Sequence, residues 1–133
     1  MRVMIDTNII ISAALFPNGK AAQALNKALL PPYEPLLCDY VISELLRIFR
    51  KKFPDKQREL EEFLISALTS VRTVTTPLEE IPVEKEIRDP KDRPILRAAL
   101  NEHAELFLTG DKDFLESSVR DPRIISVSAF LEM

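Results

Sequence analysis

The sequence has few of the residues on which several common catalytic and binding chemistries depend. It contains only two glycines, Gly19 and Gly110, so it has no glycine-rich loop of the kind that holds nucleotide phosphates. Cys38 is the only cysteine, which excludes a disulfide within the chain and suggests a small buried residue. His103 is the only histidine. It lacks partners for zinc binding or for paired acid–base catalysis, and we expect a partly exposed residue of a helix.

Long apolar runs and an excess of basic charge are absent as well. No stretch approaches the ~20 apolar residues that span a bilayer. The apolar run Ile9–Phe16 resembles a secretion signal only superficially, because Asp6 and Asn8 interrupt it and Pro17–Lys20 offers no convincing cleavage site. We therefore expect a cytoplasmic protein without membrane contact. The formal charge of −3 means that any polyanion must be attracted by bound cations or by local basic patches.

The residues that are present suit one compact domain. The chain has 133 residues, of which 46% are apolar, and this is sufficient for one hydrophobic core. Charged residues alternate with large apolar residues throughout, which is typical of a folded chain. We predict a single domain over residues 1–133.

Short apolar runs and helical spacings alternate along the chain. The runs predict strands at residues 3–5, 36–38, 71–75, 106–108 and 124–127. Apolar residues spaced three and four apart predict helices at 20–30, 40–52, from Pro54–Asp55 to about 68, at 93–103 and at 111–117. The segment 77–90 is expected to be extended. This alternation predicts an α/β fold with three layers, in which helices cover both faces of a mainly parallel sheet of about five strands.

Four acids lie where such a fold places its ligand site. Ligands bind beyond the carboxyl ends of parallel strands. Asp6 directly follows the first predicted strand, and Asp111 lies shortly after the strand at 106–108. Asp92 precedes one predicted helix, and Glu44 lies early in another. We expect these four carboxylates to meet at one edge of the sheet.

Each acid also has a structural interpretation. Asp92 and Asp111 each precede a predicted helix, where aspartate is a preferred N-cap residue. Glu44 is a good helix former and would ordinarily be solvated. Asp6 is harder to explain in this way, because an unpaired carboxylate near the buried centre of a sheet needs hydrogen-bond donors or a cation.

Four motifs together resemble the PIN-domain family, in order and in approximate spacing. Val3–Ile9 (VMIDTNI) resembles the opening strand and acid of that family, and Ile42–Leu45 (ISEL) resembles its second acidic motif. Asp89–Leu96 (DPKDRPIL) and Thr109–Leu115 (TGDKDFL) resemble the third and the fourth. The resemblance extends over essentially the whole chain, and it is closest to toxin ribonucleases of bacterial and archaeal toxin–antitoxin pairs.

The resemblance implies roles for individual residues. The acids that hold Mg²⁺ or Mn²⁺ in the family match Asp6, Glu44, Asp92 and Asp111 of this sequence. Asp113 would be an accessory ligand or would replace Asp111, and Asp89 competes with Asp92. The polar positions that orient the carboxylates match Thr7, Asn8 and Thr109. Arg93–Pro94 departs from the small or polar residues expected there.

The implied function is metal-dependent endoribonuclease activity, as the toxin of a toxin–antitoxin pair. The partners would be RNA, a protein antitoxin that blocks the acidic edge, and a second copy in a homodimer. Arg47 and Lys51 share a helical face with Glu44, and they are candidates for holding the RNA backbone, although such a face is often merely solvated. Lys20, Lys112 and Arg120 are weaker candidates.

Two alternatives remain at this stage. A catalytically inactive PIN scaffold could bind RNA or protein without cutting, although all four acids are present. A phosphatase of the haloacid dehalogenase kind also places aspartate after its first strand. That chemistry needs a second acid two residues later, where this sequence has Asn8.

Overall fold

The computed structural model describes residues 1–133 and contains one parallel five-stranded sheet in the order β3-β2-β1-β4-β5. The strands are β1 (Arg2–Ile5), β2 (Glu34–Cys38), β3 (Arg72–Val74), β4 (Leu106–Leu108) and β5 (Arg123–Ile125). The α-helices are α1 (Thr7–Leu15), α2 (Lys20–Ala28), α3 (Asp39–Lys52), α4 (Gln57–Leu68), α5 (Arg93–Asn101), α6 (Lys112–Leu115) and α7 (Val127–Leu131). The expectation of a three-layer α/β fold around a parallel sheet is confirmed.

The central strand β1 lies in the middle of the core. Its residues Val3, Met4 and Ile5 are fully buried, because helices cover both faces of the sheet. Met4 pairs with Leu36 of β2 on one side and with Phe107 of β4 on the other. The strand order reverses around β1, and the carboxyl ends of β1 and β4 therefore form the switch point at which α/β proteins bind ligands.

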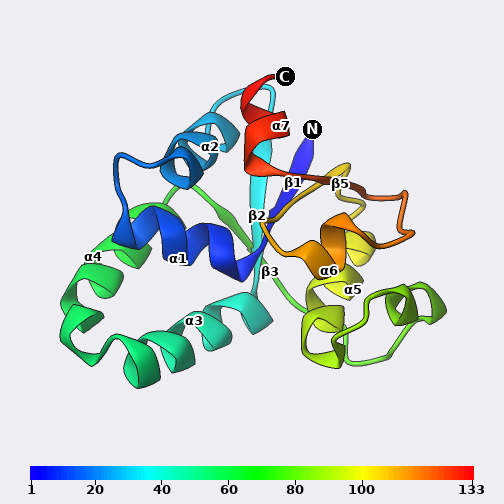
Figure 1. Ribbon diagram of the computed structural model, residues 1–133, viewed down its shortest axis with the longest axis horizontal. Coiled ribbons are helices and arrows are strands. Elements are labelled where there is room, and N and C mark those ends of the chain that lie inside the picture. Colours follow the sequence, from blue (N-terminus) through cyan, green and yellow to red (C-terminus); the bar gives the residue numbers. More distant parts are fainter.

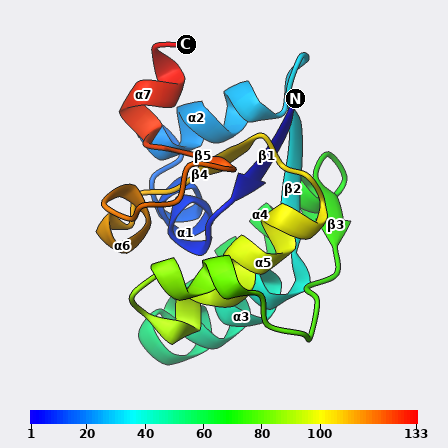
Figure 2. The same cartoon turned by 90° about the vertical axis from the view of Figure 1, so that its right-hand side faces the viewer.

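The helices divide between the two faces according to the direction of the chain. The chain moves from β1 to β2 and β3 in one direction and then returns to β4 and β5 beyond β1. Right-handed crossovers place the helices of these two parts on opposite faces. In Figure 1, α1 and α4 lie on one side of the strands and α5 on the other, and Figure 2 shows α5 in front of the sheet.

Helix α1 has no counterpart among the predicted helices. Ile9, Ile10 and Ala13 are buried, and the helix contains no charged residue. Helix α1 packs against α2, α3 and α4. A helix covered in this way needs no charged face, and without one its sequence does not show the pattern of a surface helix. Asp6 is its N-cap and accepts a hydrogen bond from the Thr7 N–H.

The C-terminal part of the chain also differs from expectation. The last strand was predicted at 124–127, but β5 ends at Ile125 and α7 begins at Val127. Ser126 caps α7, because its hydroxyl oxygen accepts a hydrogen bond from the Ala129 N–H at 3.1 Å. The segment 77–90 is not wholly extended either, since Pro82–Glu86 forms a 3₁₀-helix.

The only cysteine and the only histidine lie largely where the sequence analysis expects them. Cys38 is fully buried at the end of β2. His103 lies just beyond α5, exposed and with a φ of 54°, so it continues the chain in the left-handed conformation common after helices. The structure contains no helix that is both long and apolar enough to cross a membrane.

Candidate active site

One small pocket lies beyond the carboxyl ends of β1 and β4, in a volume of about 170 Å³. All four acids singled out in the sequence line it, together with two of the polar residues expected to orient them. The lining residues are Asp6, Thr7, Asn8, Ile11, Glu44, Ile48, Asp92 and Asp111. The fold therefore brings together side chains that are up to 105 positions apart in the sequence, between Asp6 and Asp111.

Asp6 occupies the buried end of this pocket, with 3% of its surface exposed. Its Oδ1 accepts a hydrogen bond from the Thr7 N–H at 2.8 Å, and its Oδ2 accepts one from the Thr109 hydroxyl at 2.6 Å. Burial nevertheless raises the pKa of Asp6 to about 6, with smaller contributions from the nearby carboxylates of Asp111 and Glu44. The two donors thus offset only part of the cost of burying this charge.

Hydrogen bonds of Thr7, Thr109 and Asn8 connect separate segments around the pocket. The Thr7 hydroxyl donates to Oε1 of Glu44, which links the start of α1 to α3. The Thr109 hydroxyl oxygen accepts from the Asp111 N–H at 2.9 Å while it donates to Asp6. Asn8 accepts a longer hydrogen bond, of 3.4 Å, from the Gly110 N–H. Thr7 and Thr109 therefore each donate to a carboxylate of the pocket, whereas the hydrogen bond of Asn8 is to the backbone of Gly110.

Asp92 lies at the N-terminal end of α5, but its side chain makes no capping hydrogen bond. Its pKa is raised to about 7, first by burial and then by the charges of Asp111, Asp6 and Asp89. Asp111 combines the two roles considered for it, because its Oδ1 accepts a hydrogen bond from the Asp113 N–H at 2.9 Å and it also lines the pocket. A capping position and a place in the site do not exclude each other.

Asp113 and Asp89 lie beside this pocket and do not line it. One carboxylate oxygen each from Asp89, Asp92 and Asp113 lies within 4.8 Å of the others. Asp113 also forms an ion pair with Arg88 at 2.5 Å, and Asp89 accepts a hydrogen bond from the Lys91 N–H at 3.0 Å. Asp92 therefore belongs to both groups of acids, whereas Asp113 already has a cationic partner within the protein.

The donor set of the pocket fits a hard divalent cation. No ion pair of the protein involves Asp6, Asp92 or Asp111, and Glu44 has only Arg47 at 3.8 Å. Converging carboxylates without a cation repel one another, which agrees with the raised pKa values of Asp6 and Asp92. Oxygen ligands of this kind suit Mg²⁺ or Mn²⁺.

The raised pKa values predict how the stability of the metal-free protein depends on pH. The folded carboxyls of Asp6 and Asp92 lose their protons near pH 6 to 7, whereas unfolded aspartates do so at about 3.9. The folded state therefore binds more protons, and the free energy of unfolding should fall as the pH rises from about 4 to about 7. For buried Asp6, the loss is on the order of 2–3 kcal/mol.

Thermal melting in chelator between about pH 5 and pH 8 measures this effect, and saturating Mg²⁺ should restore the stability lost at the higher pH. Asp6→Asn should show a flatter profile. A metal-free wild type whose melting temperature is the same across this range would contradict the assignment of a strained carboxylate cluster.

Tyr40 is a neighbour of the pocket that the sequence analysis missed. Its hydroxyl donates to the Lys91 carbonyl oxygen at 2.5 Å and so connects α3 to the segment bearing Asp92. Burial raises the pKa of Tyr40, and the charges of Glu44 and Asp92 raise it further. Its position one helical turn before Glu44 was the available signal, because residues four apart share a helix face.

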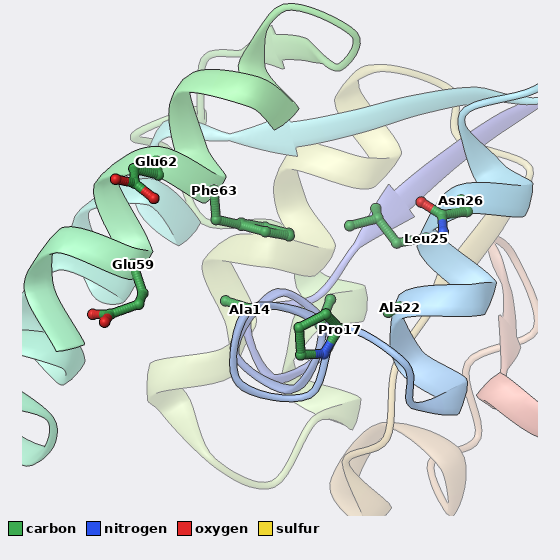
Figure 3. Close-up of a pocket in the computed structure, with 9 residues that line it drawn as sticks. Ala14, Pro17, Ala22, Leu25, Asn26, Glu59, Glu62 and Phe63 are labelled. Carbon is green, nitrogen blue, oxygen red and sulfur yellow. The ribbon is translucent and has the colours of Figure 1, made fainter.

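A larger and more apolar groove lies near the other end of α1, with a volume of about 470 Å³ (Figure 3). Phe63 of α4 extends toward Leu25 of α2, and Ala14 and Pro17 lie below these two side chains in this view. Glu59 and Glu62 line the groove on the α4 side.

Comparisons with known proteins agree with this architecture. A family model described as the PIN domain matches residues 2–113. The uncharacterized protein MJ1680 of Methanocaldococcus jannaschii is 28% identical in an alignment that covers 91% of this chain and 76% of that protein. The crystal structure of VapBC2 from Rickettsia felis, bound to a DNA fragment from their promoter, has the same fold, with a TM-score of 0.70 at 19% identity. The match covers 95% of this chain and 98% of that chain. Since the family model spans most of the sequence, the chain belongs to the PIN domain family.

Proposed function

We propose that this protein is a Mg²⁺- or Mn²⁺-dependent endoribonuclease, and that Asp6, Glu44, Asp92 and Asp111 hold the metal. The observation that carries the proposal is the carboxylate pocket at the switch point of the sheet, where buried Asp6 has no cationic partner. Membership of a family of nucleases supports it further. Asp113, which is paired with Arg88, would be an accessory residue.

A divalent ion bound here would polarise the scissile phosphate and lower the pKa of an attacking water molecule. The residues of the chain would position that chemistry. Thr109 holds the Asp6 carboxylate, and Thr7 holds that of Glu44. Because these hydroxyls already fix the two carboxylates, little reorganisation would be needed when the ion binds.

Cleavage of RNA by the purified protein tests the proposal. We expect cleavage with Mg²⁺ or Mn²⁺ and none with chelator. An intact RNA in the presence of bound metal would favour the inactive scaffold. The family match gives no support to the phosphatase alternative, which a phosphate monoester substrate would test in the same assay.

The basic side chains of α3 are expected to hold the RNA backbone. Arg47 contacts Glu44 at 3.8 Å with 63% of its side chain exposed, and Lys51 is exposed one turn farther along α3. Replacing both with Ala should weaken RNA binding and reduce its salt dependence by roughly one unit of slope per lost phosphate contact. Turnover at saturating RNA should change much less, because these residues position the backbone.

A titration of labelled RNA in Ca²⁺ at several salt concentrations measures the contribution of Arg47 and Lys51 to RNA affinity. The double variant Arg58→Ala/Lys56→Ala removes the same charge from an exposed region near α4 and is the matched control. Equal affinity and salt slope in wild type and in the α3 variant would mean that the α3 face is only solvated. The next residues to test would then be Lys20, Lys112 and Arg120.

We further propose that the protein is the toxin of a toxin–antitoxin pair. The similar structure from Rickettsia felis is that of VapBC2 with promoter DNA. An antitoxin segment would fit the groove of Figure 3 if its apolar residues faced Phe63 and Leu25 and its basic residues faced Glu59 and Glu62. Ala14 in this groove lies one turn of α1 from Ile11 in the acidic pocket, so the same segment could also cover the acids.

Changing Phe63 to Glu should disrupt this partner without affecting RNA cleavage. The variant places a charge in the apolar groove, whose lining contains none of the four acids. Co-expression with the small protein encoded by a neighbouring reading frame, followed by co-purification, measures the loss. Ile65→Glu is the control, because Ile65 lies on the same helix, is 70% exposed and does not line the groove. Equal co-purification of both variants would place the partner elsewhere.

A further inference from the structure

A second pocket lies at the same edge of the sheet, beyond the carboxyl ends of β2 and β3. Its volume is about 320 Å³. Asp39 directly follows β2, and Thr76 lies just past the end of β3. The start of α5 contributes Pro94 to the opposite wall. This edge therefore carries the carboxylate pocket at β1 and β4 and, two strands along, a pocket without an assigned role.

The two pockets are neighbours through α3 and α5. Ser43 lines the second pocket and Glu44, the next residue, lines the first. In the same way, Asp92 and Pro94 are two residues apart and line different pockets. Tyr40 lines the second pocket, and its hydroxyl bonds to the carbonyl of Lys91, which precedes Asp92. A chain held with one phosphate at the acids would thus place an adjacent nucleotide here.

The walls of the second pocket combine flat apolar faces with hydrogen-bond acceptors. Tyr40, Pro77 and Pro94 supply apolar surface, and Leu78, which is 98% exposed, also lines the pocket. The volume lies at the lower end of the ~300–1,000 Å³ typical of small-molecule sites. One planar ring system matches this size and these surfaces.

The polar groups of the pocket restrict the ligand further. Asp39 uses Oδ1 to accept hydrogen bonds from the Tyr40 N–H at 2.8 Å and the Thr76 N–H at 2.9 Å, and the nearby Thr76 hydroxyl is the main cause that lowers the pKa of this carboxyl. The hydroxyl oxygen of Thr76 is buried and, apart from this contact with Asp39, makes no hydrogen bond to the residues that line the pocket. Arg97, the only cationic side chain in the lining, is held by Glu84 and by the Pro77 carbonyl. Asp39 is exposed, and its carboxylate can accept more hydrogen bonds than these, so it disfavours a phosphate and favours a ligand that donates hydrogen bonds.

We propose that this pocket binds one nucleobase of the RNA, next to the phosphate that is cut, with Tyr40 contacting the face of the base and Asp39 accepting from its exocyclic amino group. Adenine, cytosine and guanine carry such a group. Uracil instead presents carbonyl oxygens on both sides of its only N–H, and these would face the carboxylate of Asp39. The inference rests on the proposed ribonuclease function and adds a base preference to it.

The first test is a double-mutant cycle, in which the base of the RNA and the aromatic ring of Tyr40 are removed separately and together. Single abasic positions are introduced, one at a time, along an RNA that wild type cleaves, and the dissociation constant of each RNA is measured in Ca²⁺. One abasic position adjacent to the cut should weaken binding to wild type by about tenfold, as expected for one base stacked on an aromatic ring. Tyr40→Ala should bind the intact RNA and the RNA that is abasic at that position with equal affinity. Tyr40→Phe, which keeps the ring, should still bind the abasic RNA about tenfold more weakly than the intact RNA.

The second test changes the acceptor. Asp39→Asn keeps an oxygen for the N–H groups of Tyr40 and Thr76, so the start of α3 should remain intact. Wild type should favour an amino-bearing base over uracil by about tenfold at the position found in the first test, as expected for a hydrogen bond to a charged group. Asp39→Asn should reduce this preference to near unity, because its amide can also donate to the carbonyls of uracil.

The outcomes separate this proposal from the one on which it rests. Cleavage by wild type without a sensitive abasic position, or with one that Tyr40→Ala leaves unchanged, would overturn the nucleobase pocket and leave the ribonuclease function in place. A Tyr40→Ala variant that weakens binding of intact and abasic RNA equally would reduce Tyr40 to a support for Lys91 and Asp92, which also overturns it. If wild type neither binds nor cuts RNA, both proposals fail together.

Discussion

Asp6→Asn is expected to lower the rate of RNA cleavage by at least about a hundredfold while leaving the metal-free protein folded. Outer-shell partners of a metal already contribute about 10–100-fold, and Asp6 would be a direct ligand. The amide oxygen can still accept from the Thr7 N–H, and the variant removes a buried charge whose pKa is raised to about 6. Cleavage assays and thermal melting in chelator, both at about pH 8, measure the two parts of this prediction.

Asp113→Asn is the matched control for this variant. Asp113 lies outside the carboxylate pocket and is paired with Arg88, so its loss should reduce cleavage by less than about tenfold. If Asp113→Asn is as inactive as Asp6→Asn, then Asp113 is itself a metal ligand. If Asp6→Asn melts far below wild type in chelator, then Asp6 acts mainly as an acceptor for Thr7 and Thr109, and the metal site is wrong.

Arg97→Met is expected to cause the largest loss of stability of any single change outside the hydrophobic core. Two of its guanidinium N–H groups donate to the two carboxylate oxygens of Glu84, at 2.7 and 2.8 Å, and a third donates to the Pro77 carbonyl at 2.8 Å. Glu84 is only 2% exposed. Removing one partner of a buried pair leaves an uncompensated charge and costs about 3–5 kcal/mol. A drop of the melting temperature by about ten degrees or more should follow.

A double variant distinguishes the loss of the ion pair from the cost of leaving one buried charge unpaired. Glu84→Leu/Arg97→Met removes both charges and should recover most of the lost stability, because a buried ion pair is often no better than apolar side chains of similar volume. Arg58→Ala breaks the exposed pair with Glu62 and should cost less than about 1 kcal/mol. If Arg97→Met and wild type have the same melting temperature, the stability of the segment from Pro77 to Asp92 does not depend on this ion pair.

The metal ligand candidates could be predicted because their positions follow from topology. A sheet with alternating strands and helices places the residues after β1 and β4 at one edge, whatever the details of packing. Asp6 and Asp111 are such residues, and they line the same pocket. Asp92 and Glu44 needed more than topology, since an N-cap and a solvated helix residue are the ordinary alternatives. Only the order of all four motifs distinguished them.

Other features depended on contacts that a single sequence does not contain. Helix α1 is covered by other helices and has no polar face, and the β-branched residues of β5 continue into Val127, where Ser126 instead begins a helix. The pairing of Glu84 with Arg97 joins a 3₁₀-helix to α5 across 13 positions. The pairing of Arg88 with Asp113 and the nucleobase pocket around Tyr40 likewise arise only when separate segments meet.

The central claim is that the four carboxylates support attack on RNA by water, and the ends of the cleaved RNA test it most directly. RNA should be cut in a single turnover with Mg²⁺ or Mn²⁺ in water labelled with a heavy oxygen isotope, and the products should be analysed by mass spectrometry. Direct attack by water breaks the bond from phosphorus to one ribose oxygen and adds one labelled oxygen to the phosphate, giving a linear phosphate monoester. A 2′,3′-cyclic phosphate without label would instead mean that the ribose hydroxyl attacks, and it would contradict the metal-dependent hydrolysis proposed for this site.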